Sequence, residues 1–68
     1  MSEELLNEVV SNIIEYADEA KSSAEKDDLT YGKLLAYAEA LSIIRDVYEG
    51  DLSKIGLDFD IDKRYLCS

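Results

Sequence analysis

Apolar residues recur in adjacent pairs, four positions apart, over the first part of the chain. Because an α-helix repeats every 3.6 residues, such pairs lie along one side of a helix. The pattern predicts a helix over about residues 3–26, with Ser2 as its N-cap. The paired positions are Leu5 and Leu6, Val9 and Val10, and Ile13 and Ile14.

A second helical pattern covers about residues 30–49, and Gly50 follows where a left-handed glycine commonly ends a helix. The polar break at 26–28 predicts a short turn, so the two helices should run antiparallel. Gly32 either permits a close helix crossing or marks a later helix start. The apolar positions are Tyr31, Leu34, Leu35, Ala38, Leu41, Ile44, Val47 and Tyr48.

The C-terminal part changes period. Residues 51–55 are long enough for one helical turn, and residues 57–62 alternate apolar and acidic positions, as in an extended segment. A lone strand has no partner here, so we expect a strap across the helices with its apolar side chains inward. The predicted fold is therefore all-α, in one domain (1–68): an antiparallel helical hairpin (about 3–26 and 30–49), a short third helical turn (51–55) and an extended C-terminal strap.

Composition narrows the class of protein. Cys67 is the one cysteine of this 68-residue chain, which has no histidine, so neither an internal disulfide nor a His/Cys zinc site can form. A free thiol and an acidic start predict a cytoplasmic protein. No apolar run approaches the ~20 residues of a membrane span, so no membrane partner is expected. The net charge of −9 disfavours direct binding to nucleic acid.

Carboxylates supply the candidate chemistry. Asp58, Asp60 and Asp62 have the spacing that opens a calcium-binding loop. However, Lys63 stands where that loop needs glycine, and the sequence stops before its final glutamate. We therefore expect no metal and no cofactor, with a weak calcium-responsive element at 58–62 as an alternative. No nucleophile or histidine accompanies the acids of the first helix, so we expect no enzyme.

The paired pattern of the first helix makes two adjacent apolar faces, and one neighbouring helix cannot cover both. Either the strap covers the second face, or that face binds another protein or a second copy in a four-helix bundle. This wide apolar stripe favours a protein-interaction module, with a homodimer as one form. The residues predicted to bind the partner are Leu6, Val10, Ile14, Glu8, Glu15 and Glu19.

The negative charge is concentrated in the first part of the chain. Residues 1–28 carry nine acidic and two basic residues, a net −7, whereas residues 29–68 carry −2. An acidic helix can imitate the phosphate backbone of nucleic acid. An alternative function is therefore inhibition of a DNA-handling enzyme by mimicry.

Two stretches carry a resemblance to known proteins: 29–44 (LTYGKLLAYAEALSII) and 55–60 (IGLDFD). They resemble small uncharacterised helical proteins carried on conjugative transposons and related mobile elements of Gram-positive bacteria. The resemblance covers roughly the C-terminal half. It implies a role linked to such an element, and it brings no activity, cofactor or catalytic residue.

Overall fold

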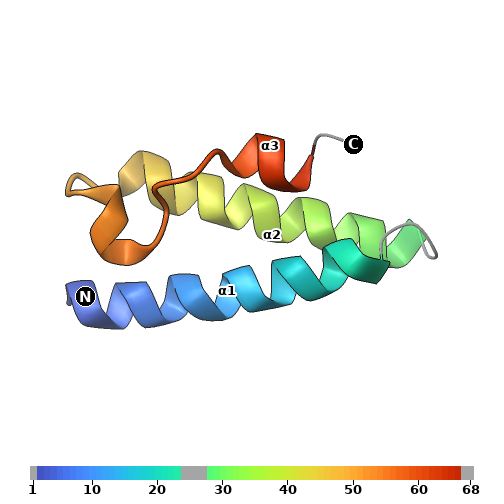
Figure 1. Cartoon of the computed structure of the whole chain (residues 1–68), viewed down its shortest axis with the longest axis horizontal. Coiled ribbons are helices and arrows are strands. Elements are labelled where there is room, and N and C mark those ends of the chain that lie inside the picture. Colours follow the sequence, from blue (N-terminus) through green and yellow to red (C-terminus); the bar gives the residue numbers. More distant parts are fainter. Residues whose placement is uncertain (1, 24–27, 67–68) are drawn as a thin grey trace.

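The computed structural model describes residues 2–23 and 28–66, and Figure 1 shows their arrangement. The helices are α1 (Glu3–Ser23), α2 (Asp28–Val47), the 3-10 turn η2 (Leu52–Ile55) and α3 (Ile61–Tyr65). α1 and α2 lie side by side and antiparallel, and no strand occurs in the described ranges. The predicted all-α hairpin with a third helical turn is confirmed. The end of the first predicted helix (24–26) and Cys67 lie outside the described residues.

The start of α1 has the predicted N-cap. The backbone N–H of Leu5 donates to Ser2 Oγ at 3.1 Å, and the N–H of Leu6 donates to the Ser2 carbonyl at 2.9 Å. Both bonds satisfy donors that a helix start leaves without partners. Glu3 and Glu4 occupy the first turn, where negative charge favours the helix dipole.

One hydrophobic core joins all four elements. Alanines at the contact between α1 and α2 let the two backbones approach closely, while larger side chains fill the space beneath η2 and α3. Burial of these apolar side chains is the main term that stabilises so short a chain. The buried residues are Val10, Ala17, Ala20, Leu34, Ala38, Leu41, Ile55, Leu57, Ile61 and Tyr65.

The two glycines of the second helical pattern differ from expectation. α2 begins at Asp28, and a Cβ at Gly32 would meet nothing within 4 Å, so Gly32 neither permits a close crossing nor delays the helix. Among the described residues the left-handed glycine is Gly56, not Gly50. A side chain at Gly50 would overlap the ring of Tyr48, so the glycine leaves room for that ring.

The C-terminal segment (52–66) runs back along the hairpin (Figure 1). Leu57 and Ile61 are buried and Phe59 is half-buried, so the predicted inward orientation is confirmed. The extended part is shorter than predicted, however, because residues 61–65 form α3. Asp60 is the N-cap of this helix and accepts from the N–H of Lys63 at 3.1 Å. A capping aspartate thus produces part of the alternation that predicted a strand.

Candidate functional site

The C-terminal segment covers one side of the hairpin. On that side Asn7 Nδ2 donates to the Lys54 carbonyl at 3.2 Å. Further along α1, Asp18 accepts hydrogen bonds from two residues of the segment. Arg64 Nη2 donates to both of its carboxylate oxygens at 2.8 and 3.0 Å, and Tyr65 Oη donates to Oδ1 at 2.8 Å. η2 therefore packs against α1, whereas α3 packs against α2 and is joined to α1 by the side chains of Arg64 and Tyr65.

Asp18 is the centre of this anchoring cluster. The Arg64 guanidinium also lies 4.9 Å from the centroid of the Phe59 ring, and Lys21 Nζ donates to the Arg64 carbonyl. Burial of Tyr65, followed by its hydrogen bond to Asp18, raises the pKa of that phenol to about 12. Sequence reasoning missed this role because nothing in the local pattern around Asp18 indicates a partner 46 residues away.

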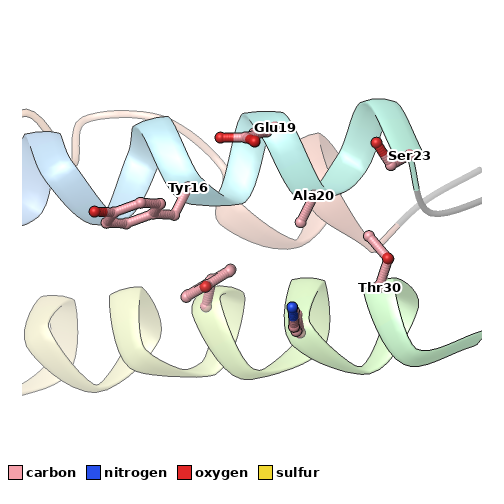
Figure 2. A pocket seen from close by; sticks show the side chains of 7 residues that line it. Tyr16, Glu19, Ala20, Ser23 and Thr30 are labelled. Atoms are coloured by element: carbon pink, nitrogen blue, oxygen red, sulfur yellow. The ribbon is translucent and has the colours of Figure 1, made fainter.

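We call the opposite side of the hairpin the open face. Figure 2 shows part of it, with the C-terminal segment passing behind the two helices. Leu5, Val9 and Tyr16 of α1 follow one another at helical spacing along this side. On α2 the corresponding side carries Ile43 and Val47. Leu5 is 48% exposed, Tyr16 57%, Ile43 56% and Val47 73%, so apolar side chains of both helices meet solvent here.

Two hollows mark the ends of the open face. The one in Figure 2 has a volume of about 310 Å³ and lies where α1 ends and α2 begins. The rings of Tyr16 and Tyr37 stack beside it, with centroids 6.0 Å apart. The other hollow has a volume of about 430 Å³ and is mostly apolar. Its lining residues are Leu6, Ile43, Ile44, Val47, Tyr48 and Glu49.

Both hollows belong to the same side of α2. Ile44, in the larger hollow, follows Tyr37 and Lys33 of the smaller hollow by seven and eleven residues. These spacings return to the same face of an α-helix. The two hollows therefore lie on one side of the hairpin, and we call the strip of the open face from one hollow to the other the groove.

An acidic edge borders the groove on α1. Glu19 lines the smaller hollow from α1 (Figure 2). Glu15 and Glu8 precede it by four and eleven residues, which places them on the same side of the helix. All three are exposed, and their carboxylates make no hydrogen bond or ion pair within 2–23 and 28–66. The three carboxylates are therefore not used in contacts that hold the described part of the fold together.

The predicted apolar contact residues are placed differently. Val10 is 0% exposed and belongs to the core, so it cannot meet a partner on this face. Ile14 is half-buried against the core. It lies on the same side of α1 as Asn7, which bonds to Lys54 in η2. Leu6 is half-buried but lines the larger hollow. The pairs are not covered alike: Leu5 is 48% exposed, whereas Ile13 and Ile14 both pack against the core.

The three alternating aspartates do not gather into a metal site. Asp60 caps α3, Asp58 is exposed in the connection before it, and Asp62 lies in the first turn of α3. In the part of the chain that the structure describes, no group of three potential ligands could hold a metal ion.

The fold and the groove define a small helical hairpin with one apolar face left uncovered. No protein-family model matches the chain, and no curated protein or solved structure shows significant similarity to it. Among the described helices, none is long and apolar enough to cross a membrane.

Proposed function

We propose that the protein is a protein-interaction module of the cytoplasm that binds another protein on its open face. The observation that carries the proposal is the exposure of Ile43 and Val47 beside an apolar hollow of about 430 Å³. Exposed apolar side chains that gather around a hollow are typical of interaction sites, whereas scattered ones are ordinary.

A binding role fits the titratable groups better than an enzymatic one. Asp18, Tyr65 and Asp51 serve contacts that hold the fold together. Tyr48 Oη donates to Glu3 Oε2 at 2.6 Å and ties the end of α2 to the start of α1. The hydrogen bonds of these side chains stabilise the fold. The glutamates at the groove edge have no nucleophilic side chain beside them that could take part in catalysis.

Val47→Glu tests the proposal. This side chain is 73% exposed, so the variant should fold, but a carboxylate at the larger hollow would have to be buried by a partner. In cells that naturally contain the protein, cross-linking of the wild type should capture a partner protein. The Val47→Glu variant should no longer capture that partner. The matched control is Leu66→Glu, which places the same charge at an exposed apolar position of the C-terminal segment. Equal capture by both variants would contradict the proposal.

A homodimer would also cover the open face. The mass in solution across a concentration series separates self-association from binding to a different protein. We expect the monomer mass of 7.7 kDa. A dimer that dissociates with Val47→Glu but not with Leu66→Glu would assign the face to a second copy instead.

Mimicry of nucleic acid is a second candidate function. It is favoured by the unpartnered carboxylates of Glu8, Glu15 and Glu19 along one edge of α1, and it agrees with the resemblance to mobile-element proteins. A mimic needs these acids but not the apolar groove. Inhibition of a DNA-binding enzyme that survives Val47→Glu would support mimicry, and inhibition that needs Val47 would support the groove.

A further inference from the structure

The open face combines an apolar groove with charge along one of its edges, and this combination restricts what can bind. The groove floor is apolar at the larger hollow, and the α1 edge carries Glu8, Glu15 and Glu19. A partner must therefore present an apolar stripe with positive charge beside it. A partner with acidic or strongly polar flanks would leave the three carboxylates unpaired.

The length of the groove suits one helix. From Leu5 to Ala20 the α1 side extends for about 22 Å, the length of a helix of about 15 residues. Two antiparallel helices with a third in the groove between them bury an amphipathic stripe by the usual ridge-into-groove packing. A peptide that binds as an added β-strand would instead need a free sheet edge, which the described residues do not contain.

A second copy of the chain is a poor occupant on charge grounds. Each copy carries a net charge of −9 and would bring its own row of three glutamates to the shared interface. Like charges brought together in this way oppose association. A cationic helix would instead bring opposite charge to the three carboxylates, and Lys33 is the one basic residue among those that line the two hollows.

We infer that the occupant of the open face is a cationic amphipathic helix of another protein, with its apolar stripe on the hollow at Val47 and its basic flank along Glu8, Glu15 and Glu19. The inference rests on the proposed function and names the chemistry of its partner. The carboxylate edge then acts as the specificity-determining part of the face, while the apolar side chains supply most of the contact area.

A synthetic helical peptide of about 15 residues tests the inference. It carries leucines at helical spacing and lysines on both flanks, and its control carries glutamates in place of the lysines. We expect the lysine peptide to bind the full chain, with affinity falling as salt rises, and the glutamate peptide not to bind. Amide shifts in a two-dimensional NMR spectrum should concentrate on the open face. Equal binding of the two peptides, or shifts confined to the C-terminal segment, would overturn the inference.

Two pairs of substitutions that each remove two negative charges show which part of the protein attracts the lysine peptide. Glu8→Gln with Glu15→Gln should weaken binding of the lysine peptide by roughly 3- to 10-fold, since two exposed ion pairs are lost. The control pair, Asp58→Asn with Asp62→Asn, removes the same charge from the C-terminal segment and should change the affinity by less than about 2-fold. Similar losses in both pairs would mean that net charge alone attracts the peptide, and the inference would fail.

The two hypotheses fail separately. If the lysine peptide does not bind but the cross-linked partner still depends on Val47, the open face binds a protein of other chemistry and only this inference falls. If the partner is retained by Val47→Glu as well, the proposed function falls with it. Self-association that buries the open face would replace the cationic helix with a second copy.

Discussion

At the scale of residues, two glycines differ in whether the fold requires them. Gly32 lies inside α2 with open space around it, so the helix gains nothing from its flexibility. Gly56 ends η2 at φ 79°, a left-handed conformation that side chains with a Cβ adopt at a cost. Its N–H also bonds to the carbonyls of the turn. The first glycine is therefore replaceable and the second is not.

Gly32→Ala should stabilise the protein by about 1 kcal/mol, because alanine has the higher helix propensity and loses less backbone entropy on folding. Urea unfolding followed by circular dichroism measures the change in the free energy of unfolding. The control, Gly56→Ala, should destabilise by roughly 1–2 kcal/mol. A Gly32→Ala variant less stable than the wild type would show that the space beside α2 is not open.

At the scale of elements, α3 depends on its surroundings. A five-residue helix is far too short to be stable alone, because forming its first turn costs more than its few hydrogen bonds return. The first and last residues of α3, Ile61 and Tyr65, are buried in the core. Asp18 of α1 also accepts hydrogen bonds from Arg64 and Tyr65. The position of α3 is thus decided by contacts with helices far away in sequence.

Asp18→Ala should loosen α3 before the rest of the fold. The change leaves the Tyr65 hydroxyl and the Arg64 guanidinium without their acceptor, and we expect a loss of about 1 kcal/mol, since the ion pair is half-exposed. Hydrogen exchange should accelerate at residues 61–66 more than in α1. Glu15→Ala, one turn earlier on α1 and without a partner among the described residues, is the control. Equal effects of the two variants would assign the loss to the removal of an acidic side chain from α1 rather than to the contacts with Arg64 and Tyr65.

At the scale of the whole molecule, hydrogen bonds from two tyrosines close the fold at both ends of the hairpin. Tyr48 bonds to Glu3 near the N-terminus, and this bond, followed by burial, raises the pKa of Tyr48 to about 12. Tyr65 bonds to Asp18 near the other end, and its pKa is also raised to about 12. In both cases the fold favours the neutral phenol over the phenolate.

Stability should therefore fall in strongly alkaline solution. The folded pKa of each phenol lies above the ordinary value of 10.0, so this contribution is complete below pH 10 and is lost as the pH rises through 12. The tyrosinate absorbance of the folded protein should show two groups that ionise near pH 12. Tyr48→Phe and Tyr65→Phe should each remove one of them. Unchanged titration curves in both variants would contradict the two hydrogen bonds.

The shape of the molecule explains why one face stays open. Its extents are 37 × 19 × 14 Å, so the chain is a thin slab in which the C-terminal segment covers one side of the hairpin. Sixty-eight residues supply two long helices and one short segment. Nothing in the described residues remains to cover the second side, so the groove stays exposed.

The sequence by itself determined the elements. Period, capping residues and breaks act over a few positions, so the spacing of Leu5 to Ile14 predicts α1 and Ser2 predicts its start. Asp51 and Gly56 likewise predict η2. Local energetics decide each of these features, and local sequence contains them.

Only the tertiary structure decided which member of each apolar pair is buried. Val9 and Val10 form one apolar pair, yet Val9 is half-buried whereas Val10 is 0% exposed in the core. Which member is buried depends on where α2 and the C-terminal segment pack, and Asp18, Arg64 and Tyr65 hold that segment across 46 and 47 residues of sequence. Contacts between distant residues depend on chain topology, which hydrophobic spacing along one helix does not encode.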